Sequence, residues 1–152
     1  NTTMSNDSAA IQLSRLLDVM RENVQHFHDL LKEEQQAIRT LSFGQFSDVT
    51  ERKSCLLDTI RDLEQERRRL TGVLDQDGEQ LSGDLQSKEE GLIEIIGATD
   101  RMNRLNASLI AQSLAFLQGS LSLWQRSPAS APLYSETGSV VDAVPQSVGI
   151  KG

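Results

Sequence analysis

Few side chains in this sequence have the types and spacing that chemistry requires. His26 and His28 lie two residues apart, which on a helix places them on nearly opposite faces, so they cannot bind one metal ion together. Cys55 is the only cysteine, which excludes an internal disulfide, and the two leucines after it favour a partly buried, inert thiol. The many carboxylates have no spacing that distinguishes a catalytic acid and base from the charges of a solvated helix. We therefore expect a non-enzymatic protein with no metal and no cofactor.

The charge of the chain limits its partners. A net charge of −7 disfavours contact with a phosphate backbone, so we expect no nucleic-acid partner. The one basic cluster, residues 67–69, lies among acidic residues, and the favoured i, i+4 pair of Glu64 and Arg68 predicts a solvated helix face. No apolar run is long enough to span a membrane, and the first residues lack the basic and apolar regions of a signal peptide. Together with the single cysteine, these features predict a reduced, intracellular setting.

The elements that must position any binding site are long helices. In residues 8–41 apolar side chains recur alternately four and three apart, with one break at Glu34, which places them on one stripe of a helix. Leu16 and Leu30 widen this stripe beyond a two-stranded seam. Because such a stripe is not stable alone in water, the helix requires a partner. The stripe consists of Leu13, Leu17, Met20, Val24, Phe27, Leu31, Ile38 and Leu41.

A second periodic stretch covers residues 46–75. Gly44 is expected to end the first helix, and the short connection predicts an antiparallel hairpin. Lys53 and Arg67 fall on the second stripe, where their long stems can cover apolar surface while their charged heads reach water. The glycines and acidic residues of residues 76–85 predict a loop or a frayed helix end. The apolar members of the second stripe are Val49, Leu56, Ile60, Leu63, Leu70 and Leu74.

The third predicted helix, residues 87–125, has the most informative pattern. Ser87 and Glu90 have the spacing of a capping box, which predicts Ser87 as the N-cap. Asn103 and Asn106 interrupt the apolar residues, either to bond a bound peptide or, as we favour, to fix the helix register as buried polar residues. The second half of this helix is apolar over most of its circumference, so it must be buried on all sides or bind a partner.

These patterns predict an all-α fold. We expect an elongated antiparallel hairpin with a third helix packed on it, as a three-helix, coiled-coil-like bundle. Residues 1–126 would form a single helical domain. Residues 127–152 contain all three prolines, many Ser and Gly residues and no periodicity, which predicts a flexible tail.

An ordered set of motifs runs along the predicted helices. The first two helices contain Leu30-Leu31-Lys32-Glu33-Glu34-Gln35-Gln36-Ala37 and, after a short turn, Glu51-Arg52-Lys53 and Leu56-Leu57. The third helix and the tail contain Asn103-Arg104-Leu105-Asn106, Leu109-Ile110, Ser113, Phe116-Leu117, Leu121, Tyr134 and Gly138. In this order, the motifs resemble those of the FlgN family of flagellar export chaperones. The resemblance extends over roughly residues 11–138.

The resemblance implies a cytoplasmic chaperone of hook-associated proteins FlgK and FlgL. It would bind their aggregation-prone C-terminal segments and deliver them to the membrane export gate component FlhA, with Tyr134 docking there. From the residues alone, a client segment that pairs as an amphipathic helix fits the wide apolar face. The alternative is a structural coiled-coil homodimer, in which this helix pairs with its own copy and binds no flagellar client. The client-binding residues that the resemblance implies are Leu109, Ile110, Leu114, Phe116, Leu117, Leu121 and Trp124.

Overall fold

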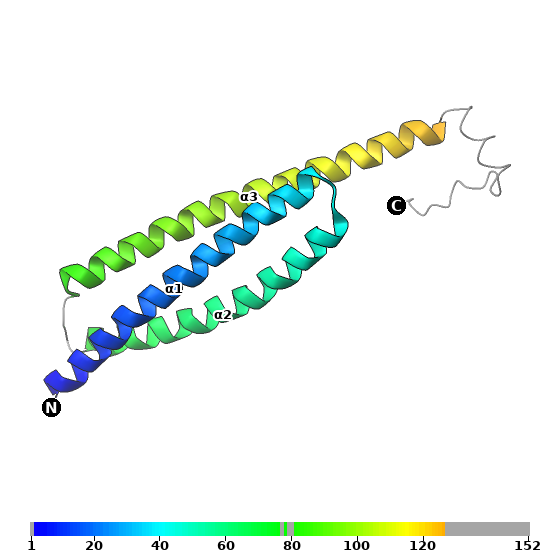
Figure 1. The fold of residues 1–152 in the computed structure, drawn as a ribbon. Coiled ribbons are helices and arrows are strands. Elements are labelled where there is room, and N and C mark those ends of the chain that lie inside the picture. The colour runs from blue at the N-terminus through cyan, green and yellow to red at the C-terminus, as the bar shows by residue number, and fades with distance from the viewer. Residues whose placement is uncertain (1, 77, 79–80, 127–152) are drawn as a thin grey trace. The chain divides into compact units, whose positions relative to one another are not determined.

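The chain forms three α-helices. The computed structural model describes residues 2–76, 78 and 81–126, and for residues 2–7 and 126 only the backbone. Its elements are α1 (Thr2–Arg39), α2 (Phe43–Gln76) and α3 (Gly83–Arg126), with no strand among the described residues (Figure 1). This confirms the predicted all-α helical fold. The predicted tail, residues 127–152, lies outside the described residues.

The chain divides into two compact units, Asn1–Ser108 and Leu109–Gly152. The first unit is a bundle of α1, α2 and the part of α3 that ends at Ser108. Within it α1 and α2 run antiparallel, as the short connection between them predicts (Figure 1). The described part of the second unit is the remainder of α3, residues 109–126.

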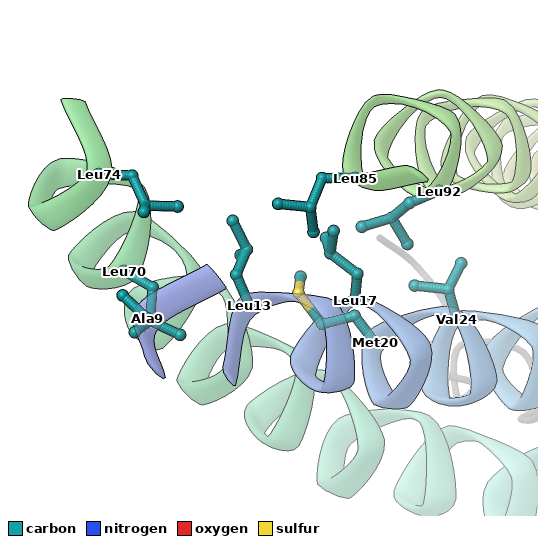
Figure 2. Close-up of a cluster of buried hydrophobic side chains, with 9 residues drawn as sticks. All are labelled: Ala9, Leu13, Leu17, Met20, Val24, Leu70, Leu74, Leu85 and Leu92. Atoms are coloured by element: carbon teal, nitrogen blue, oxygen red, sulfur yellow. The ribbon is translucent and has the colours of Figure 1, made fainter. Parts of the chain in front are cut away.

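The core of the bundle is a cluster of aliphatic side chains from all three helices. Figure 2 shows these side chains directed from the three helices toward a shared interior. Burying one leucine side chain stabilises a fold by about 1.5–3 kcal/mol, so this cluster is a main source of the stability of the bundle. The cluster consists of Ala9, Leu13, Leu17, Met20 and Val24 of α1, Leu70 and Leu74 of α2, and Leu85 and Leu92 of α3.

The apolar stripes are buried to different degrees. All the predicted stripe residues that lie in α1 are buried, as is Leu30, and Leu16 packs partly buried against the core. Leu41 lies beyond the end of α1 and is exposed. In α2 burial is complete only near the two ends, at Val49, Leu70 and Leu74. The middle of the α2 stripe, Leu56, Ile60 and Leu63, is only partly buried.

The connection between α1 and α2 is built on Leu41. Leu41 has a φ of 52°, in the left-handed region that most side chains avoid. The Ser42 amide donates to the Ala37 carbonyl (2.9 Å) and the Leu41 amide donates to the Ile38 carbonyl (3.2 Å), which are the two bonds of a Schellman motif. Leu41 therefore points outward. The predicted helix end at Gly44 is wrong, because Gly44 lies inside α2, one residue after its start.

The start of α3 also differs from the prediction. Ser82, and not Ser87, is the N-cap, because its hydroxyl accepts the backbone amide of Leu85 (3.2 Å). Ser87 lies in the second turn of the helix and is exposed. The earlier start has a physical reason, since the additional turn brings Leu85 into the core.

A buried polar network occupies the break in the α1 stripe. Glu34 is only 4% exposed, and Lys53 Nζ donates to both of its carboxylate oxygens (3.0 and 3.2 Å). Asn106 Nδ2 donates to Glu34 Oε1 (3.0 Å) and to the Leu31 carbonyl (2.8 Å). Lys53 Nζ also donates to Asn103 Oδ1 (3.2 Å). The head of Lys53, which was predicted to reach water, thus joins all three helices.

Candidate functional site

The described residues offer little for catalysis. No group of three or more His, Cys, Asp or Glu side chains in the described ranges is arranged to hold a metal ion. His28 Nδ1 lies 3.4 Å from the hydroxyl of Thr99 on α3, whereas His26 lines a groove between α1 and α2. The two histidines therefore lie in different parts of the bundle and do not face a common site.

The groove between α1 and α2 has a volume of about 670 Å³ and is lined by both charged and apolar residues. Arg52 donates to Glu33 (2.9 Å) and to Asp48 (3.4 Å), and the hydrogen bond with Glu33 is the main reason that the pKa of Arg52 is raised. Cys55 also lines the groove and is exposed, so the prediction of a partly buried thiol is wrong. Exposed ion pairs of this kind contribute little binding energy, and they form no acid–base pair directed at a substrate.

Exposed apolar side chains gather in residues 109–124 of α3, which we call the distal segment. Phe116 is 72% exposed and Leu123 is 68% exposed, both far above the exposure of core residues. Of the residues predicted to bind a client, Leu109 and Ile110 are half-buried. The others are exposed and comprise Leu114, Phe116, Leu117, Leu121 and Trp124.

These side chains lie on one broad face of the helix. At about 100° per residue, the apolar side chains of the distal segment cover an arc of about 180° centred on Ser113. Ser120 and Trp124 also lie near the centre of this face, each about 20° from Ser113. Leu123 belongs to the face although it was not among the predicted client-binding residues. Its spacing of seven from Phe116 was the signal that could have identified it.

The distal segment has no charged side chain. Residues 105–125 contain no Asp, Glu, Lys or Arg, and Arg104 and Arg126 flank them. The opposite side of the helix carries small residues, including Ala111, Ala115 and Ser122. In the part of the chain that the structure describes, no helix is long and apolar enough to cross a membrane. A partner of this face would have to be selected by shape and apolar contact and not by ion pairing.

The two asparagines before the distal segment belong to the bundle. Asn106 is 1% exposed and bonds to α1, and Asn103 accepts a hydrogen bond from Lys53 of α2. Gln35 of α1 also donates to Asn106 Oδ1 (3.3 Å). Asn106 fits the register-fixing interpretation, because a shift of α3 by one residue would leave its buried amide without partners. Asn103 is exposed, so the prediction that both asparagines are buried is wrong for Asn103.

Comparison with known families decides the general identity. A family model described as FlgN protein matches residues 4–141, which include α2, α3 and all but the first two residues of α1. The chain belongs to the FlgN family. It is thus a member of a family of flagellar export chaperones, and the resemblance seen in the sequence motifs is confirmed. Comparisons with curated proteins and with solved structures gave no match. Tyr134, the predicted gate contact, falls within the matched residues but outside the residues that the structure describes.

Proposed function

We propose that this FlgN-family protein binds the C-terminal segments of the hook-associated proteins FlgK and FlgL through the distal segment. In the cytoplasm it would prevent premature assembly or aggregation of these clients and then deliver them to the export gate component FlhA, with Tyr134 contacting the gate. The observation that supports this proposal is the broad apolar face of the distal segment, most of whose large side chains are exposed in the free chain.

The chemistry of that face suits a chaperone. A client segment that has not yet assembled exposes apolar surface, and covering it contributes about 25 cal/mol per Å² of apolar surface removed from water. Ordering the client offsets much of this energy, so binding can be specific and still reversible at the gate. The lack of charge in residues 105–125 is consistent with a client region that is itself apolar.

Titration calorimetry with the C-terminal segment of FlgK from the same organism tests the proposal. We expect one-to-one binding with a negative heat-capacity change, which is the signature of apolar burial. Leu117→Asp, halfway along the distal segment, should weaken binding at least roughly thirtyfold, as expected for an apolar contact worth about 2 kcal/mol.

The matched control is Ala115→Asp, which adds the same charge to the opposite side of the same helical turn. It should bind the segment nearly as well as the natural chain, while circular dichroism shows both variants to be equally helical. Absence of binding to both FlgK and FlgL, combined with a tight dimer in light scattering, would contradict the proposal and favour the structural homodimer.

A further inference from the structure

The groove between α1 and α2 lies on the side of this helical hairpin that α3 leaves uncovered. Two packed helices form a groove on each of their two sides. His28 of α1 contacts Thr99 of α3 (3.4 Å), whereas His26 lines the open groove. Residues two apart lie about 200° from each other around a helix, so the open groove faces away from α3. This side of the hairpin is therefore available to a further helix.

The open groove has an apolar floor. Leu30 of α1 is 6% exposed and Leu56 of α2 is half-buried, and both line the groove, whose volume is about 670 Å³. The lining extends over residues 26–33 of α1 and 48–59 of α2, which corresponds to roughly 10–17 Å along the helices, or about two to three helical turns. An elongated groove of this kind suits the side chains of another helix.

Carboxylates form both rims of the groove. Asp29 and Glu33 are four residues apart on α1, and Asp48 and Glu51 are three residues apart on α2, so each pair lies on one helix face. Arg52 also lines the groove. Four carboxylates and one guanidinium give the lining a net charge of −3 with histidine neutral. The groove is thus apolar at its floor and acidic at its rims.

One carboxylate on each rim has no counter-charge. Arg52 is shared between Glu33 (2.9 Å) and Asp48 (3.4 Å). Asp29 accepts a hydrogen bond from a neutral side-chain amide (3.2 Å). Among the described residues Glu51 forms no hydrogen bond or ion pair. Asp29 and Glu51 are therefore free to pair with cations of a partner, one on each side of the floor.

The way α3 packs on the hairpin shows which chemistry fits such a groove. Leu85 and Leu92 of α3 are buried in the core. Beside them, Lys88 donates to Asp18 of α1 (2.9 Å). A helix with an apolar stripe and a flanking lysine thus already occupies one side of the hairpin.

We propose that the open groove between α1 and α2 binds an amphipathic helix of a second protein, with Lys or Arg on both flanks of its apolar stripe. The stripe would cover Leu30 and Leu56. The flanking cations would meet Asp29 and Glu51. Apolar contact would supply most of the affinity, while the charges would select the partner and accelerate its association. The groove shares no residue with the distal segment, so this site is additional to the proposed client face.

Cys55 provides a local readout, because it is the only cysteine and is exposed in the groove. The probe is a synthetic helical peptide of roughly 20 residues with a leucine stripe and lysines on both flanks. A matched peptide has glutamates in place of the lysines. Alkylation of Cys55 by iodoacetamide is followed by mass spectrometry. We expect the lysine peptide to slow alkylation roughly tenfold when its free concentration is about ten times its Kd, and the glutamate peptide to have no effect.

Two double variants separate the groove from the general charge of the chain. Asp29→Asn with Glu51→Gln should weaken binding of the lysine peptide at least roughly fivefold, as expected for the loss of two exposed charge pairs. The matched control is Glu90→Gln with Glu94→Gln, which removes the same charge from exposed positions of α3 about 160° from the buried Leu92. The control should bind the peptide as tightly as the natural chain.

Several results would overturn the proposal. Peptide binding that leaves Cys55 reactive, or equal weakening in both double variants, would mean that the peptide follows the overall negative charge. Equal protection of Cys55 by both peptides would exclude selection by the acidic rims. Protection that rises with the concentration of this chain alone would assign the groove to a second copy. Absence of peptide binding to the folded chain would also overturn the proposal, and none of these results depends on FlgK binding by the distal segment.

Discussion

The buried carboxylate of Glu34 makes the bundle sensitive to single substitutions. Lys53→Met should lower the free energy of unfolding by about 3 kcal/mol, because Glu34 would stay buried beside Asn106 without its counter-charge. The double variant Glu34→Leu with Lys53→Met should recover much of this loss, since it removes both charges. Urea unfolding measures the effect.

Arg69→Met is the control for the Lys53 prediction. Arg69 pairs with Glu66 at 2.6 Å on an exposed part of α2, so its removal should change the stability little. If Lys53→Met lowered the free energy of unfolding as little as Arg69→Met, the carboxylate of Glu34 would have to be hydrated in solution.

The stability of the bundle should also depend on pH through Glu64. Hydrogen bonds from Arg67 and, to a lesser extent, Arg68 lower the pKa of Glu64 from 4.5 to about 2. Because the folded pKa lies below the unfolded one, the ionised carboxylate stabilises the fold above pH 4.5, and this contribution disappears as the pH falls toward 2. Partial exposure to water reduces its size.

We therefore expect Glu64→Gln to lower the free energy of unfolding by about 1–2 kcal/mol at neutral pH. The difference between the variant and the natural chain should shrink as the pH falls from 4.5 toward 2, the window set by the two pKa values. Urea unfolding at a series of pH values measures this. A difference that stays constant through that window would show that the ion pairs of Glu64 do not stabilise the fold.

At the level of the helix, the start of α3 gives two substitutions of opposite sign. Ser82→Ala should lower the free energy of unfolding by about 1 kcal/mol, because the amide of Leu85 loses its capping acceptor. Ser87→Ala should be neutral or stabilising by a few tenths of a kcal/mol, since alanine has the higher helix propensity within a helix. Thermal unfolding of both variants measures the two changes in stability. If Ser87→Ala were the more destabilising of the two, Ser87 and not Ser82 would be the N-cap.

On the scale of the molecule, the two units have different sources of stability. The bundle of residues 1–108 has a core from three helices, whereas the described residues of the distal segment expose their apolar side chains. Backbone amides near the core should exchange slowly with solvent, and those of residues 109–126 should exchange much faster in the free protein. Client binding should slow exchange in the distal segment by at least roughly tenfold, as measured by hydrogen-exchange mass spectrometry.

A chain that ends at Ser108 is the matched control for this prediction. It should unfold at nearly the same temperature as the full chain, because the buried cluster lies entirely before that residue. It should bind no client. A large loss of stability would show instead that the bundle depends on the distal segment.

The sequence determined the features that depend on local periodicity. The spacing of Leu13, Leu17, Met20 and Val24 predicted which face of α1 is buried, because side chains on one helix face share one solvent environment. The second half of α3 likewise stood out as the candidate site, because its lack of charge and the width of its apolar arc are properties of a single helix. The ordered motifs also sufficed to indicate the FlgN family.

The tertiary structure decided the features that depend on residues far apart in the chain. Glu34 looked like a break in a pattern, and only the approach of Lys53 and Asn106, which lie on other helices, shows that it is buried and paired. The capping role of Ser82 and the exposure of Cys55 depend in the same way on how the helices pack. Periodicity along a helix identifies its apolar face, but the partners of a buried polar group are set by which helices meet there and in what register.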